Sequence, residues 1–131
     1  MTHFQKAILA LAGATAVGIG TAILISPAAF YTSYGITLGS DPSLLSEIRA
    51  PGGALLVMGL FMLAGLVRPG FANVSRWIAA AVFLSDGLAR LLSLALDGMP
   101  DEGLLIAAAF EIAIGLLCTT PRRARRVVTD T

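Results

Sequence analysis

The chain has 131 residues, of which 56% are hydrophobic and only 13% are charged, and its mean hydropathy is +0.85. Soluble domains carry about 25% charged residues, and a soluble chain of this size could not bury so much apolar surface. The composition therefore excludes a soluble domain, a disordered tail and a nucleic-acid-binding module, and it indicates that lipid surrounds most of the chain. The formal net charge is +1, and the single Cys excludes an internal disulfide and a paired-Cys site.

Four apolar stretches stand out along the chain, and a proline follows each of them within a few residues. Each stretch is about 17–20 residues long, which lets a helix cross a hydrocarbon core about 30 Å thick. A helix in lipid satisfies its own backbone groups, whereas an isolated strand does not. The sequence therefore predicts an all-α fold, an integral membrane four-helix bundle with up-down-up-down topology in a single domain. The predicted spans are residues 7–25, 51–67, 77–96 and 103–119.

Positively charged residues gather on one side of the predicted bundle. Lys6 precedes the first span, Arg68 and Arg76 lie between the second and third, and four arginines follow the last. By the positive-inside rule both termini are expected in the cytoplasm. The tail, residues 121–131, is expected to contact anionic lipids of the bilayer through its arginines. These are Arg122, Arg123, Arg125 and Arg126.

The longest predicted connection, residues 26–50, lies on the outer side of the membrane. Within it, Asp41 followed by Pro42 is typical of a helix start. We expect a short outer helix over residues 43–49 that lies on, or leads into, the second span, with Pro51 causing a bend between the two.

Small residues recur at every fourth position of the first span, and a second row of small residues, Ala12, Ala16 and Gly20, runs beside them. Small residues let membrane helices approach one another closely. The stripe therefore has two interpretations, packing inside the bundle or contact with a second copy or a partner protein. Its members are Ala10, Ala14, Gly18 and Ala22.

Three charged residues fall inside predicted spans, where each costs at least about 2.5–3.5 kcal/mol. Asp86, Arg90 and Ser93 follow one another at spacings of four and three, so they share one face of the third span. At about 1.5 Å per residue, Arg90 and Glu111 lie at similar depths below the outer ends of their spans. We therefore predict that Arg90 meets Glu111 across the bundle and Asp86 along its own helix.

These charges predict a polar pocket in the outer half of the bundle. Arg90 is its expected anchor, and Glu47 and Arg49, at the outer mouth of the second span, are its expected rim. Two arginines near apolar walls favour a lipid-like or small anionic ligand. The candidate ligand-binding residues are Glu47, Arg49, Asp86, Arg90, Ser93 and Glu111.

Other interpretations of the buried charges remain open. They can lock the helices of a structural subunit of a larger membrane complex without any ligand. Asp86 or Glu111 can instead act as a general acid or base in a membrane enzyme, or move protons in a proton-coupled carrier. Three carboxylates and two guanidiniums give the cluster a formal charge of −1. Unless Glu47 stays in water, we expect one protonated carboxyl or one bound cation.

Histidine and cysteine are scarce in this chain. His3 is the only His and lies in the N-terminal tail, and Cys118 lies at the cytoplasmic end of the fourth span. The sequence therefore assigns no catalytic residue, no metal ligand and no cofactor. It favours a non-enzymatic binding or accessory protein over an enzyme.

Residues 47–53 (EIRAPGG), residues 87–93 with 97–100, and Glu111 with Gly115 resemble an uncharacterised bacterial family of small four-span proteins, the domain-of-unknown-function family 4345. The resemblance implies a four-helix integral membrane fold, placed in a bacterial inner membrane, and no established activity. In architecture the chain also resembles the DoxX-type small four-span proteins, some of which are associated with quinone or thiol redox chemistry. The lack of His and Cys in the middle of the spans weakens a direct redox role here.

Overall fold

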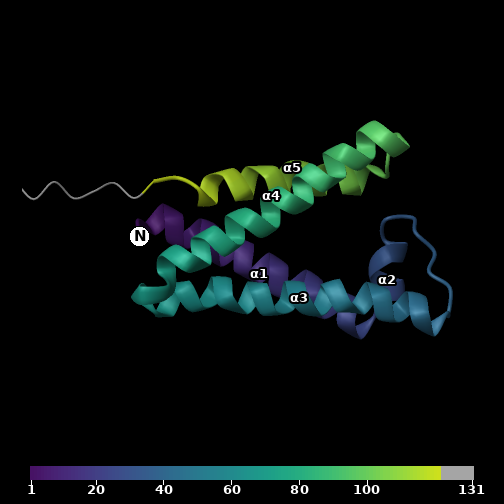
Figure 1. Cartoon of the computed structure of the whole chain (residues 1–131), viewed down its shortest axis with the longest axis horizontal. Coiled ribbons are helices and arrows are strands. Elements are labelled where there is room, and N and C mark those ends of the chain that lie inside the picture. The colour runs from purple at the N-terminus through teal and green to yellow at the C-terminus, as the bar shows by residue number, and fades with distance from the viewer. Residues whose placement is uncertain (122–131) are drawn as a thin grey trace, which may run out of the picture.

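The computed structural model describes residues 1–121, and every regular element in that range is helical (Figure 1). Three helical stretches are long and apolar enough to cross a membrane, whereas the last helix is shorter, at 17 residues. These features indicate an all-helical membrane protein. The predicted lipid-contacting arginines of the tail lie outside the described residues. The elements are α1 His3–Ile25, α2 Pro27–Thr32, α3 Pro42–Val67, the 3-10 turn η1 Pro69–Phe71, α4 Ala72–Asp97 and α5 Glu102–Cys118.

Side-chain caps define where three of the helices begin. Thr2 and Gln5 form a capping box at the start of α1, in which each side chain accepts the other residue's backbone N–H at 3.2 Å. At the start of α3, the Asp41 carboxylate accepts the backbone N–H groups of the first turn, as the Asp41–Pro42 pair predicts. Asp101 caps α5 in the same way, at 2.8 Å. Each cap satisfies backbone donors that have no partner within the helix.

The short outer helix that the sequence predicts over residues 43–49 is not a separate element. The structure has one continuous helix, α3, which begins at Pro42 and passes through Pro51 to Val67. A proline removes one backbone hydrogen bond from a helix, and membrane helices tolerate that loss. The residues predicted as a short outer helix therefore form the first turns of α3, and the helix continues through Pro51.

The helices pack mainly as two pairs, α1 with α3 and α4 with α5, and α3 also packs on α4 (Figure 1). Glycines set the close approach of α1 and α3. A Cβ atom on Gly20 would lie 2.6 Å from the backbone N of Leu56, and one on Gly59 would lie 2.7 Å from the backbone N of Val17. Because glycine has no side chain, the two backbones come into direct contact at these positions.

The row of small residues that packs inside the molecule is not the predicted stripe. Ala12, Ala16 and Gly20 are buried, whereas Ala14 and Gly18 of the stripe are exposed. A Cβ atom on Gly18 would meet nothing within 4 Å. Packing within the bundle therefore belongs to the neighbouring row, and contact of the stripe with a second copy or a partner stays a prediction.

The start of α1, η1 and the end of α5 lie at one end of the molecule, and the α4–α5 turn lies at the other (Figure 1). Side chains join the elements at the first end. Gln5 Nε2 on α1 donates to the carbonyls of Thr120 and Pro121, at 3.4 Å each. The chain therefore returns to its starting end after α5.

Candidate functional site

An ion pair links the C-terminal part of α4 to the middle of α5. Arg90 Nε donates to Glu111 Oε2 at 2.8 Å. Glu111 is buried, at 8% exposure, whereas the Arg90 side chain is 39% exposed. Glycines let the helices come this close, since a Cβ atom on Gly87 or on Gly115 would lie 2.6 Å from a side-chain carbon of the other helix. The structure thus contains the pair that the matching depths of Arg90 and Glu111 predict.

Asp86 does not join that pair. Among residues 1–121, Arg90–Glu111 is the one ion pair within 4.0 Å, so the predicted bond between Asp86 and Arg90 is absent. Asp86 lies one helical turn before Arg90, which is close enough for a contact. The guanidinium turns instead toward α5, where the more buried Glu111 carboxylate accepts its Nε–H.

A cavity of about 500 Å³ lies between the two helix pairs, and all five α-helices contribute to its lining. Asp86, Arg90 and Glu111 form its charged wall. Apolar side chains of α1 and α3, such as Ile19 and Leu55, line it as well. The volume falls in the range of about 300–1,000 Å³ that is typical of small-molecule sites. A mostly apolar cavity with a few charged groups can hold an amphipathic molecule.

The helix α2 and the residues after it line the same cavity with aromatic rings. Phe30 packs edge-on against Tyr31 and Tyr34, with ring centroids 5.3 Å and 5.5 Å apart. Tyr34 also reaches the start of α5, where a Cβ atom on Gly103 would lie 3.2 Å from its ring. This aromatic segment, Phe30 to Tyr34, therefore extends from the end of α1 to the first turn of α5.

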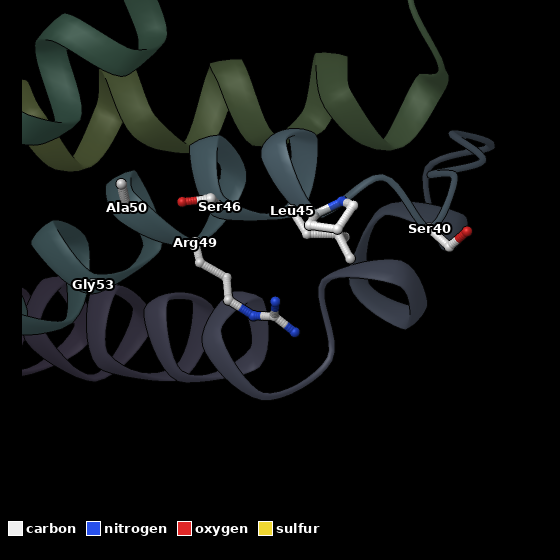
Figure 2. A pocket seen from close by; sticks show the side chains of 7 residues that line it. Ser40, Leu45, Ser46, Arg49, Ala50 and Gly53 are labelled. Carbon is white, nitrogen blue, oxygen red and sulfur yellow. The ribbon is translucent and has the colours of Figure 1, made fainter.

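Three of the candidate ligand-binding residues do not line this cavity. Ser93 is exposed and donates its hydroxyl to Asp97 at 3.0 Å, and Glu47 is exposed on α3. Arg49 points toward the end of α1, where its Nε donates to the carbonyl of Leu24 at 3.1 Å (Figure 2). The last carbonyls of a helix lack partners within the helix and attract cations, which accounts for the position of Arg49.

Arg49 instead belongs to a separate hollow of about 610 Å³, which is open on the surface at the start of α3 (Figure 2). Ser40 and Ser46 supply the hydroxyl groups of its lining. Of the two residues of the predicted rim, Arg49 is therefore part of another surface feature, and Glu47 lines neither hollow.

Arg76, whose charge bears on the predicted orientation, also binds the carbonyls at a helix end, here at the opposite end of the molecule. Its guanidinium is buried on α4 and donates to the carbonyl of Cys118 at 2.8 Å and to that of Thr120. A cation at a helix C-terminus stabilises the helix dipole and satisfies carbonyls that lack partners. Arg76 therefore fastens the end of α5 to α4, much as Arg49 fastens the end of α1 to α3.

Among residues 1–121, no group of three or more His, Cys, Asp or Glu side chains is arranged to hold a metal ion. Comparison with curated proteins and with solved structures gives no significant match. A family model, described as a domain of unknown function (DUF4345), matches residues 4–120, a range that contains every residue of the cavity lining. The chain therefore belongs to the DUF4345 family.

Proposed function

We propose that this chain is a membrane-embedded binding protein that holds a lipid-like or other small amphipathic molecule in the cavity between the α1–α3 and α4–α5 pairs. The cavity itself carries the proposal, because a space of about 500 Å³ with apolar walls and an ion pair on one side is suited to such a molecule. Arg90 keeps 39% of its side chain exposed on the cavity wall, where a bound molecule can reach it.

The residues that line the cavity support binding more than catalysis. They include Asp, Glu, Arg, Ser, Thr and Tyr but neither His nor Cys. Covalent catalysis by Ser or Thr needs an adjacent base to activate the hydroxyl. No hydrogen bond joins Thr15 or Ser85 to an acidic side chain in the described residues, and Ser85 donates to the carbonyl of Val82 at 2.9 Å. The lining therefore favours a non-enzymatic role.

The proposal includes four crossings of a bacterial inner membrane, with both termini in the cytoplasm. At about 1.5 Å per residue, the 17 residues of α5 span about 26 Å, and a bilayer thins locally around a short helix at modest cost. Lys6, Arg68 and Arg76 belong to the end that holds the start of α1 and η1, which the positive-inside rule assigns to the cytoplasm. The aromatic segment then faces outward, and the tail arginines meet anionic lipids inside.

Native mass spectrometry of gently extracted protein tests the binding proposal. We expect a retained small molecule in the wild type and its loss in Ala107→Phe, which fills the cavity from α5. Ala54→Phe, which fills it from α3, should give the same loss. Ala109→Phe is the matched control, since Ala109 is exposed on α5 and does not line the cavity.

Circular dichroism and gel filtration are used to check that each variant keeps the fold. If folded wild type carries no small molecule, or if Ala107→Phe, Ala54→Phe and Ala109→Phe retain it equally, the cavity is not the binding site.

A further inference from the structure

The charges on the wall of the cavity do not sum to zero. Asp86, Arg90 and Glu111 are the charged residues of its lining. Arg90 and Glu111 neutralise one another at 2.8 Å, which leaves the Asp86 carboxylate without a partner in the ion pair. The formal sum of two carboxylates and one guanidinium is −1. The Asp86 side chain is exposed on the lining of the cavity rather than packed among other side chains. A charge without an ion-pair partner is costly within a membrane span, so a group that supplies positive charge to this wall stabilises it.

The structure removes the reason for expecting an anionic ligand. That expectation depends on two arginines at one pocket, and Arg49 is engaged at the end of α1 rather than at this cavity. The remaining Arg90 is already shared with Glu111. An anion beside this wall would gain attraction from one guanidinium and meet repulsion from two carboxylates.

The aromatic segment adds a second feature that suits a cation. Phe30, Tyr31 and Tyr34 all line the cavity, and their edge-to-face packing turns ring faces in different directions. Ammonium groups are attracted to the faces of aromatic rings, most strongly where water is excluded. A cation therefore finds favourable groups both at the aromatic segment and at Asp86.

Building on the proposed function, we infer that the ligand is a hydrophobic organic cation, a protonated amine or quaternary ammonium joined to an apolar body. Its ammonium group binds at the Asp86 carboxylate and makes the charged wall neutral. Its apolar body lies against the side chains of α1 and α3 that line the rest of the cavity.

Three probes of the same shape and different charge test this inference. They are 4-phenylbutylamine, which is an ammonium ion at neutral pH, 4-phenylbutan-1-ol and 4-phenylbutyrate. Binding to the full chain in an uncharged maltoside detergent is measured by equilibrium dialysis, and partition into empty micelles is subtracted. We expect the ammonium to bind at least about tenfold more tightly than the alcohol, equivalent to about 1.4 kcal/mol, and the carboxylate to bind most weakly.

Asp86→Asn should remove the preference for the ammonium and leave the affinity for the alcohol unchanged. Asp97→Asn is the matched control, because it makes the same change on the same helix at a residue that does not line the cavity. Equal loss of preference in both variants would show that general surface charge, not contact with Asp86, attracts the cation, and would overturn the inference.

The outcomes for the wild type separate this inference from the proposed function. If all three probes bind equally, or the carboxylate binds most tightly, and Ala107→Phe abolishes the binding, the cavity is a binding site without the cation preference. The inference then fails and the proposed function stands. If none of the probes binds and native mass spectrometry finds no retained molecule, both fail together.

Discussion

Arg90 on α4 and Glu111 on α5 are joined by a 2.8 Å hydrogen bond between Nε and Oε2, and both side chains line the same cavity. The bond gives a partner to the carboxylate of Glu111, whose side chain is only 11% exposed. The pair therefore connects the packing of two helices to the proposed site, and the two roles can be separated by substitution.

Arg90→Ala should destabilise the protein because it leaves the buried Glu111 carboxylate without its partner. Removal of one member of a buried pair costs about 3–5 kcal/mol, and the partial exposure of Arg90 places the expected loss near about 3 kcal/mol. The double variant Arg90→Met/Glu111→Leu should recover most of that stability, since apolar residues need no partner. Unfolding in detergent, followed by circular dichroism, measures both. A double variant as unstable as Arg90→Ala would contradict this account of the pair.

Arg76→Ala should detach the end of α5. Arg76 is 6% exposed, and its guanidinium donates to two carbonyls at the C-terminus of that helix. Hydrogen bonds to charged groups contribute about 1.5–3 kcal/mol each, so we expect a loss of at least about 2 kcal/mol in the free energy of unfolding. Arg68→Ala, at an exposed arginine of the same end, is the control and should change stability by less than about 0.5 kcal/mol. Comparable losses in the two variants would contradict the role assigned to Arg76.

Gly20→Ala should destabilise the contact between α1 and α3, whereas Gly18→Ala should not. A Cβ atom on Gly20 would lie 2.6 Å from one backbone atom of α3 and 2.7 Å from another, which are not free to move aside. Overpacking of this kind costs about 1–3 kcal/mol. At Gly18 the new methyl group meets nothing within 4 Å, and the reduced freedom of the unfolded chain should raise stability by up to about 1 kcal/mol. Thermal unfolding of the two variants side by side measures the difference, and equal effects would contradict the helix contact.

Single cysteines at two open glycines test the orientation. Gly39 precedes α3 and Gly70 lies in η1, and a Cβ atom at either position would meet nothing within 4 Å. In a Cys118→Ala background, a membrane-impermeant maleimide added to intact spheroplasts should label Gly39→Cys and leave Gly70→Cys unlabelled until the cells are lysed. The reverse pattern would show the opposite orientation, and labelling of both would contradict membrane crossings between them.

The sequence predicted the ion pair because charges within apolar spans need partners, and Arg90 and Glu111 were the pair whose depths matched. It did not predict which carboxylate Arg90 would choose. Asp86 lies on the same helix and within reach, and only the packing of α4 against α5 through Gly87 and Gly115 brings Glu111 to the guanidinium. Depth follows from counting residues along a helix, whereas the rotation of one helix against another does not.

The positions of Arg49 and Arg76 show the same limit. The sequence suggests that these arginines set orientation or surround a pocket, whereas both bind carbonyls at the end of another helix. The helix α2 is absent from the predicted elements because the predicted first span stops at residue 25 and a proline follows it. A proline in the first turn followed by Phe30, Tyr31 and Tyr34 was the signal that could have revealed it.

The binding cavity is best tested by native mass spectrometry of the full chain, with 4-phenylbutylamine added to gently extracted protein. We expect that folded wild type carries one small molecule per chain, that the amine displaces it, and that Ala107→Phe carries neither. If folded wild type is detected only at the mass of the bare chain, with or without the amine, the proposed binding cavity is contradicted.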